Sequence, residues 1–380
     1  MKIVLSIIII IAIAALALFL FSGGNDPGAP GGKIDISEAM AGNDSGYSKA
    51  LAPVDFKFPE DYGAHQGFRT EWWYYTGNLF TENGLRFGFQ FTIFRHSLSA
   101  DSARGKSAWA VNNIYMGHFA ISDIENDEFY YFERINRETP GYAYASARPF
   151  IVKIGDWRIE GSFQGDTLLP EMRISAAEKD ISIDITLIPE KPMALHGIKG
   201  LSPKSSQPGN ASYYYSFTDL KAAGTIAING ESHKVSGKAW MDREWSTSAL
   251  SQRQSGWDWF SVKLDKGYDL MYFQIRGADN RSVDFAKGTL IYPDGSTEMI
   301  KMQDAYAEAL EYWDSPLGGR YPVKWKITIP KKDILLETSA VINKQEMDLS
   351  LRYWEGAIDV KGTWGGERTT GMGYLEMTGY

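Results

Sequence analysis

Residues 87–94 read FGFQFTIF, with an apolar side chain at every second position. Residues 180–188 (DISIDITLI) and residues 324–329 alternate in the same way. A period of two is typical of a β-strand that buries one face. Turn sequences separate such runs, as in residues 82–84 (ENG) and 229–230 (NG). Many short strands at this spacing predict an all-β sandwich or barrel.

Residues 302–313 are the one stretch after the N-terminus with some helical character. They are rich in Ala and Glu, which favour helices, but no good N-cap precedes them. The sequence leaves this stretch open between helix and strand.

The same plan occurs twice along the chain. Residues 72–79 (WWYYTGNL) align with residues 257–264 (WDWFSVKL), and in both copies a turn glycine and then a glutamine follow. Residues 237–242 (GKAWMD) align in the same order with residues 371–376 (GMGYLE). Repetition in order predicts two units of one architecture.

The repeat sets the predicted domain boundaries. We expect a first barrel over residues 55–245 and a second over residues 246–380, beginning with the polar connector 246–255 (STSALSQRQS). In this alignment Asp242 corresponds to Glu376. A closed sheet of about eight strands can hold one small ligand on its inner face.

An unbroken apolar run, residues 3–21, lies at the N-terminus, and Ser6 is its only polar member. At about 1.5 Å per residue, a helix of this length nearly crosses a hydrocarbon core of about 30 Å. We expect residues 1–24 to be a signal peptide or a membrane anchor. The run is longer than the apolar core of a usual signal peptide, which favours the anchor, although Ser22 and Gly24 can serve a cleavage site.

The residues after this run indicate the compartment. Residues 25–54 are expected to be a flexible linker, because their first part is rich in Gly and Pro. The globular part is then expected outside the cytoplasm, in the periplasm or at the cell surface. It is membrane-anchored or secreted according to whether the N-terminal run is retained or cleaved.

The composition excludes several classes of function. The formal charge of −8 and the lack of a basic stripe argue against nucleic acid as a partner. Cysteine is absent, which excludes disulfides, thiolate metal sites and a Cys nucleophile. The histidines lack companions at ligand spacing, so neither a metal nor another cofactor is expected. No Gly-x-Ser-x-Gly elbow, phosphate loop or His-Glu-x-x-His motif occurs, which disfavours a classical serine hydrolase.

Five motifs carry a family resemblance. They are residues 65–79 (HQGFRTEWWYYTGNL), 240–245 (WMDREW), 256–261 (GWDWFS), 353–356 (YWEG) and 373–380 (GYLEMTGY). With them the chain resembles the carotenoid hydratase (hydroxyneurosporene synthase)-like, or AttH-like, lipocalin family over nearly all residues after the linker. The resemblance implies two tandem lipocalin-like β-barrels and an apolar small-molecule or lipid ligand. Members include hydratases, predicted secreted hydrolases and transporter-associated proteins, so the resemblance defines the fold better than the chemistry.

Carboxyl groups recur among indoles in these motifs. Strand alternation places Trp240, Asp242 and Glu244 on one face of their strand. An apolar, aromatic setting disfavours the ionised form of a carboxyl group, so its pKa rises and it can donate a proton near neutrality. Water addition to a double bond needs such an acid, aromatic faces that stabilise the cation, and a base. The candidate catalytic residues, with Asp242 first as the acid and the histidines as bases, are Asp242, Glu244, Glu71, Asp258, His118 and His65.

The candidate ligand-binding residues are aromatic: Trp72, Trp73, Tyr75, Trp240, Trp245, Trp257 and Trp259. A structural reading of both sets stays open. An acid beside Arg243 can be part of an internal ion pair, and the Trp residues and His118 can belong to the core.

Two functions therefore remain. The first is extracytoplasmic binding of a hydrophobic small molecule or lipid, accompanied by water addition to a C=C bond. The alternative is a non-catalytic lipid carrier or an accessory protein of a membrane transporter, tethered through the N-terminal helix. The short connector predicts that residues 240–245 and 256–261 meet at the domain interface, where ligand sites are common. Convergence of Asp242 and a second proton-transfer group on one cavity favours the enzyme, whereas pairing of all the acids with arginines favours the carrier.

Overall fold

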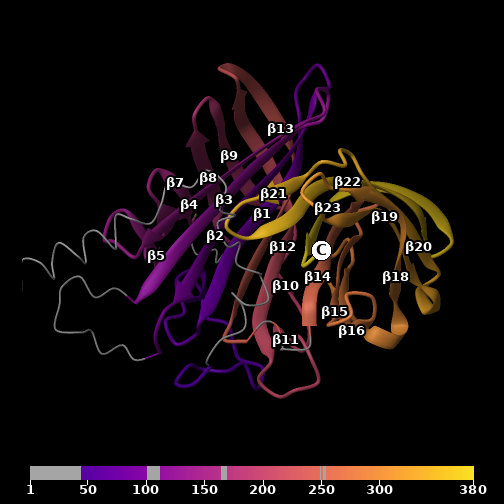
Figure 1. Ribbon diagram of the computed structural model, residues 1–380, viewed down its shortest axis with the longest axis horizontal. Coiled ribbons are helices and arrows are strands. Elements are labelled where there is room, and N and C mark those ends of the chain that lie inside the picture. The colour runs from indigo at the N-terminus through magenta and orange to yellow at the C-terminus, as the bar shows by residue number, and fades with distance from the viewer. Residues whose placement is uncertain (1–43, 101–111, 164–168, 249, 251–253) are drawn as a thin grey trace, which may run out of the picture. The chain divides into compact units, whose positions relative to one another are not determined.

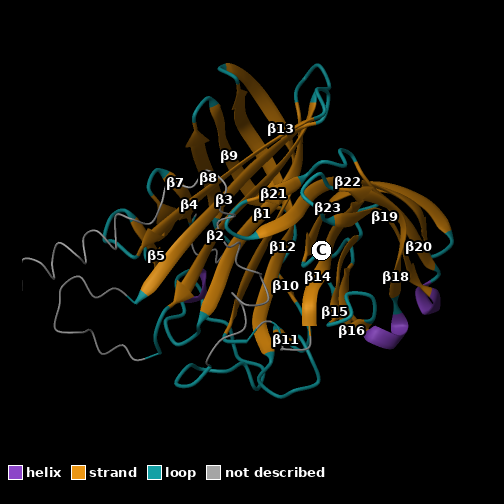
Figure 2. Cartoon of the chain, in the orientation of Figure 1, coloured by secondary structure: helices purple, strands orange, loops and turns teal. Residues whose placement is uncertain are grey.

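The structure, a computed structural model, describes residues 44–100, 112–163, 169–248, 250 and 254–380. The predicted anchor (1–24) and residues 25–43 of the predicted linker lie outside the described residues. Within these ranges, no helix is long and apolar enough to cross a membrane. Nearly all regular structure is β-strand (Figure 2). Two sheets curl into a nearly closed barrel and a half-barrel, which confirms the predicted all-β, lipocalin-like fold.

The first sheet forms the barrel. Its strands run in the spatial order β4-β3-β2-β1-β13-β12-β9-β8-β7-β6-β5, with β10 and β11 also paired to β12 (Figure 1). The bounds are β1 (Thr70–Phe80), β2 (Arg86–Ser97), β3 (Asn113–Asp123), β4 (Glu128–Arg137), β5 (Ala143–Ala147), β6 (Phe150–Ile154), β7 (Trp157–Ser162), β8 (Glu171–Glu178), β9 (Ile181–Pro189), β10 (Ala194–Leu195), β11 (Leu201–Pro203), β12 (Ala211–Ile228) and β13 (Glu231–Ser246).

The second sheet forms the half-barrel. Its order is β17-β16-β15-β14-β23-β22-β20-β19-β18, with β21 also paired to β22. The bounds are β14 (Gln254–Leu264), β15 (Asp269–Gly277), β16 (Val283–Ile291), β17 (Thr297–Lys301), β18 (Tyr306–Asp314), β19 (Arg320–Ile329), β20 (Ile334–Ala340), β21 (Glu346–Asp348), β22 (Arg352–Trp364) and β23 (Glu367–Thr378). Three short 3₁₀ turns complete the described regular structure: η1 (Glu60–Tyr62), η2 (Met302–Asp304) and η3 (Pro330–Lys332).

The register of the two sheets follows the sequence repeat. In the first sheet Tyr74 of β1 lies opposite Asp242 of β13. In the second sheet Trp259 of β14 lies opposite Glu376 of β23. These are the pairs that the alignment of the two copies makes equivalent, so the repeated motifs occupy equivalent strands.

The ambiguous stretch 302–313 forms η2 and most of β18. Ala307, Ala309 and Trp313 pack against the half-barrel core, whereas Glu308 is exposed. The inward alternation has a period of two up to Ala309, where the register shifts, and tertiary packing therefore overrides the helical propensity of Ala and Glu.

Alternation along β1 and β13 divides their side chains between two cores. Trp73 and Met241 belong to the cluster inside the barrel. Tyr74 and Trp240 belong to another cluster, which also contains Trp259 of the second sheet. The outer face of this part of β1 and β13 is therefore buried against the second sheet, and a polar side chain there is removed from water.

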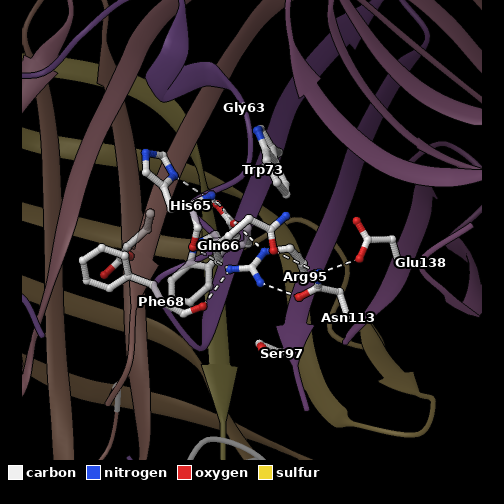
Figure 3. A network of polar contacts seen from close by, with 12 residues as sticks. Gly63, His65, Gln66, Phe68, Trp73, Arg95, Ser97, Asn113 and Glu138 are labelled. Atoms are coloured by element: carbon white, nitrogen blue, oxygen red, sulfur yellow. Dashed lines mark hydrogen bonds and ion pairs between the residues drawn. The ribbon is translucent and has the colours of Figure 1, made fainter. Parts of the chain in front are cut away.

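A buried ionic cluster lies inside the barrel and fixes the segment that precedes β1. Glu71 forms ion pairs with Arg95 of β2 and Arg243 of β13, and all three side chains are fully buried. Arg95 also donates hydrogen bonds to the backbone carbonyls of His65 at 2.9 Å and Phe68 at 2.8 Å (Figure 3). Burial alone would raise the pKa of Glu71, but the two guanidinium groups outweigh it and hold that pKa well below its usual range.

We predict that Glu71→Gln destabilises the fold by about 3–5 kcal/mol, because two buried guanidinium groups lose their counter-ion. The measurement is urea unfolding at neutral pH, compared with Glu128→Gln. Glu128 is exposed at the start of β4, so this control should stay within about 0.5 kcal/mol of the wild type. A Glu71→Gln variant as stable as the control would show that the cluster does not hold the barrel together.

Candidate functional site

A cavity of about 90 Å³ lies between the two sheets. One water-sized group needs about 10–15 Å³, so the cavity holds several. Its lining residues come from both sheets and their loops, and most are aromatic or aliphatic: Trp72, Tyr74, Phe94, His118, Lys204, Asp242, Glu244, Leu250, Trp257, Trp259, Phe273, Ile275, Leu351, Tyr353 and Glu376. An apolar wall with a few convergent polar groups is the usual form of a small-molecule site.

Asp242 projects from β13 into this cavity. Its carboxyl group accepts hydrogen bonds from Tyr214 Oη at 2.6 Å, from Trp240 Nε1 at 2.6 Å and from Ser216 Oγ. Burial raises the pKa of Asp242 to about 7, although these donors act in the opposite direction. Part of the Asp242 population is therefore neutral at neutral pH and can donate a proton.

Glu376 projects into the same cavity from β23 of the other sheet. Its Oε1 accepts a hydrogen bond from Trp257 Nε1 at 2.7 Å. Burial raises the pKa of Glu376 to about 7, and the charge of Asp242 adds to the rise. The equivalent acids of the two repeats thus meet at one site.

A third carboxyl group, Glu355 of β22, lies directly opposite Glu376 in the sheet. Its Oε1 accepts a hydrogen bond from Tyr74 Oη at 2.7 Å, and its buried Oε2 has no hydrogen-bond partner among the described residues. Burial and the neighbouring Glu376 raise the pKa of Glu355 well above its ordinary value. No ion pair between described residues involves Asp242, Glu355 or Glu376, and the more distant charge of Lys204 only partly offsets the rise in the pKa of Glu376.

The other predicted acids are held in ion pairs. Glu244 lines the cavity but pairs with Lys204 at 2.7 Å. Asp258 forms an ion pair with Arg276, and Glu71 forms the cluster inside the barrel. The structural interpretation, in which a candidate acid belongs to an internal ion pair, thus applies to these three acids. It does not describe Asp242, because the neighbouring Arg243 points to the opposite face of the strand.

The two predicted histidine bases lie in different places. His118 of β3 lines the cavity, with Nδ1 at 2.7 Å from Tyr353 Oη. His65 lies inside the barrel, where its ring stacks on Trp245 with centroids 3.7 Å apart and its nitrogens lie 3.1 Å from Glu71 and Asp61. The structure therefore brings His118, but not His65, to Asp242.

The predicted ligand-binding aromatics divide in the same way. Trp72, Trp257 and Trp259 line the cavity. Trp240 does not line the cavity; it donates a hydrogen bond to Asp242 and makes an edge contact with the ring of Trp259. The remaining three, Trp73, Tyr75 and Trp245, belong to the core inside the barrel.

Sequence reasoning missed part of the site. The alignment with Asp242 could have identified Glu376 as a site residue, but the sequence prediction assigned it no role. The others are Glu355, Tyr74, Tyr214, Tyr353 and Lys204, whose places depend on neighbouring strands and on the contact between the sheets. Within the described ranges, no cluster of three His, Asp or Glu is arranged to hold a metal ion.

The class of this protein is defined by two lipocalin-like units and by the cavity between them, which is aromatic and contains unpaired, buried carboxyl groups. The sequence profile of the AttH-like family matches residues 49–380, and the chain belongs to this family. No curated protein sequence matches it significantly.

Solved structures share the fold. A protein from Nitrosomonas europaea assigned to AttH is 34% identical, with a TM-score of 0.77, over 87% of this chain and 99% of that chain. Kievitone hydratase from Nectria haematococca is 15% identical, with a TM-score of 0.66, over 88% of this chain and 96% of that chain. CghA is 10% identical, with a TM-score of 0.53, over 89% and 97%. At these identities the last two likenesses concern the fold alone.

The raised pKa of Asp242 predicts a pH-dependent penalty on stability. Between about pH 4 and pH 7 the folded state binds more protons at Asp242 than the unfolded state, so the free energy of unfolding falls as pH rises through this window. Three pKa units correspond to about 4 kcal/mol at most. Asp242→Asn removes this contribution. The free energy of unfolding of the variant should therefore increase relative to that of the wild type as pH rises.

The measurement is urea unfolding at about pH 5 and about pH 8 for wild type, Asp242→Asn and the control Asp314→Asn. Asp314 is exposed at the end of β18, so the control should follow the wild type. Parallel curves for wild type and Asp242→Asn would mean that Asp242 is ionised at both pH values.

Proposed function

We propose that the protein adds water across a carbon–carbon double bond of an apolar molecule bound between the two sheets. The observation that carries this proposal is the convergence of two unpaired carboxyl groups, each with its pKa raised to about 7, on one aromatic cavity. Kievitone hydratase has the same fold and is, by its name, a hydratase, which supports the reaction class.

The first step uses Asp242 as the acid. In its neutral form it transfers a proton to one carbon of the double bond, and the other carbon becomes a cation. The indole faces of Trp72, Trp257 and Trp259 stabilise this charge because their π-electrons attract cations. Tyr214 and Trp240 donate hydrogen bonds to the carboxylate that Asp242 leaves behind.

The second step adds water. A water oxygen bonds to the cationic carbon, and its surplus proton passes to a base on the cavity wall and then to solvent. Asp242 regains a proton, and Glu376, a carboxyl group of matching pKa on the same cavity, can supply it before recharging from solvent. The double bond has then gained one hydrogen and one hydroxyl group, and the protein returns to its starting state.

The apolar N-terminal run supports a location outside the cytoplasm, membrane-anchored or secreted. The substrate of such a protein would be an apolar small molecule or a lipid, reached at or near the membrane. We propose this location and this partner together with the reaction.

A second candidate function is that of a non-catalytic lipid carrier or an accessory of a transporter. It is favoured by the ion pairs of Glu244, Asp258 and Glu71, which are typical of structural acids. Such a protein would bind the same apolar ligand without changing it.

The test is incubation with kievitone, and separately with neurosporene, in oxygen-labelled water, followed by mass spectrometry. We expect a product that contains one added labelled water. Asp242→Asn should lower its rate by about 10²–10⁴-fold while binding is kept. The wild-type rate should fall as pH rises above about 7, because the acid ionises.

Trp257→Ala should instead weaken binding, because a lost indole removes apolar contact area. Unchanged turnover in Asp242→Asn would contradict the assigned acid. Binding of both probes without any product would favour the carrier.

A further inference from the structure

We propose that Tyr353, held by His118 and Glu133, is the base that positions the attacking water and passes its proton to solvent. This inference rests on the proposed hydration and names the group that the reaction still lacks. Tyr353 would be a catalytic residue, and His118 and Glu133 would be positioning residues that act through it.

The hydrogen bond between Tyr353 and His118, the inner end of the chain Tyr353–His118–Glu133, joins the two sheets. Tyr353 lies on β22 of the half-barrel sheet and His118 on β3 of the barrel sheet (strands labelled in Figure 1). Both side chains line the cavity. Tyr353 Oη lies 2.7 Å from His118 Nδ1. His118 is fully buried, so this bond is shielded from water.

The outer end reaches solvent. Glu133 of β4 lies directly opposite His118 in the sheet, and its Oε1 is 3.1 Å from His118 Nε2. The Glu133 side chain is 18% exposed, and Ser350 Oγ donates a hydrogen bond to the same oxygen. Burial alone would raise the pKa of Glu133, but the hydrogen bonds from His118 and Ser350 lower it, so Glu133 is a carboxylate.

A carboxylate at Nε2 fixes the tautomer of His118. Glu133 can only accept a hydrogen bond, so Nε2 carries a proton, and in the neutral ring Nδ1 is then the acceptor. The hydroxyl proton of Tyr353 then points to Nδ1. Only the lone pairs of the Tyr353 oxygen face the cavity. These lone pairs can accept a hydrogen bond from a water molecule, and the chain of hydrogen bonds behind them strengthens that acceptor.

The titratable groups around Tyr353 keep it neutral at rest. Burial first, and then the charges of Glu355 and Glu376, raise the pKa of Tyr353 well above its ordinary value. Tyr353 therefore cannot persist as phenolate and must give up its proton as it takes one.

The surplus proton of the attacking water leaves along the hydrogen bonds from Tyr353 through His118 to Glu133. As the water oxygen bonds to the cationic carbon, one water proton moves to Tyr353 Oη and the Tyr353 proton moves to His118 Nδ1. His118 becomes a cation beside the Glu133 carboxylate, and its Nε2 proton then leaves through Glu133 to solvent. His118 is then protonated at Nδ1 only. Between turnovers a solvent proton returns through Glu133 to Nε2, and the Nδ1 proton passes to Tyr353 Oη as Tyr353 releases the proton it had taken to water in the emptied cavity, which restores the starting tautomer. Asp242 regains its proton separately.

The first test needs no substrate. The chain has five histidines, so NMR of the imidazole nitrogens of the full-length protein can resolve His118. We expect a neutral ring protonated at Nε2, a changed Nδ1 signal in Tyr353→Phe, and a mixture of tautomers in Glu133→Gln. Tyr321→Phe removes another buried phenol that donates to a carboxylate, away from the cavity, and should leave His118 unchanged. A His118 ring protonated at Nδ1 in the wild type would overturn the proposal.

The second test uses kievitone turnover with the same variants. Tyr353→Phe should lower the rate by about 10²-fold or more with binding kept, Glu133→Gln should lower it less, and Glu133→Asp should restore part of the loss. Tyr321→Phe should turn over like the wild type.

The outcomes separate the two proposals. Normal turnover in Tyr353→Phe would overturn the base assignment and leave the hydration standing. A wild type that binds kievitone and neurosporene without turnover but shows the expected His118 tautomer would favour the carrier over the hydration and leave the hydrogen-bonded chain intact.

Discussion

The burial of carboxyl groups without a cation is the constraint on which this site depends. Where two sheets meet, Asp242 and Glu355 are buried and Glu376 is half-buried, and no lysine or arginine among the described residues forms an ion pair with them. An isolated buried carboxylate is so unfavourable that the group takes up a proton instead. The same desolvation that destabilises the fold near neutral pH supplies a proton donor to an apolar cavity.

The acids that pair with arginines have a structural role in this chain, in contrast to Asp242. Glu71, on the other face of β1, lies between two guanidinium groups inside the barrel and remains ionised. Asp258 is likewise paired with an arginine. One sheet thus contains both arrangements on its opposite faces, one that holds segments together and one whose proton can be transferred.

Much of this could be predicted from the sequence, and the limit has a physical cause. Alternation identified the strands, and the repeat predicted the register that places Asp242 and Glu376 on equivalent strands. Alternation also shows that Glu71 and Trp72 face opposite ways, but not which face meets the second sheet. The partners of each acid come from strands distant in the sequence, so charge pairing was not predictable. Glu355 was missed because its setting depends on β23 and on the other sheet.

The most direct test of the account is the protonation state of the buried carboxyl groups, measured by NMR of Asp and Glu carboxyl carbons in wild type and Asp242→Asn. We predict wild-type signals that titrate at about pH 7, one of which is absent from Asp242→Asn, and a lower midpoint for Glu376 once its charged neighbour is gone. Titration of every carboxyl group below about pH 5 would contradict the account, because no neutral acid would then be present where the reaction needs one.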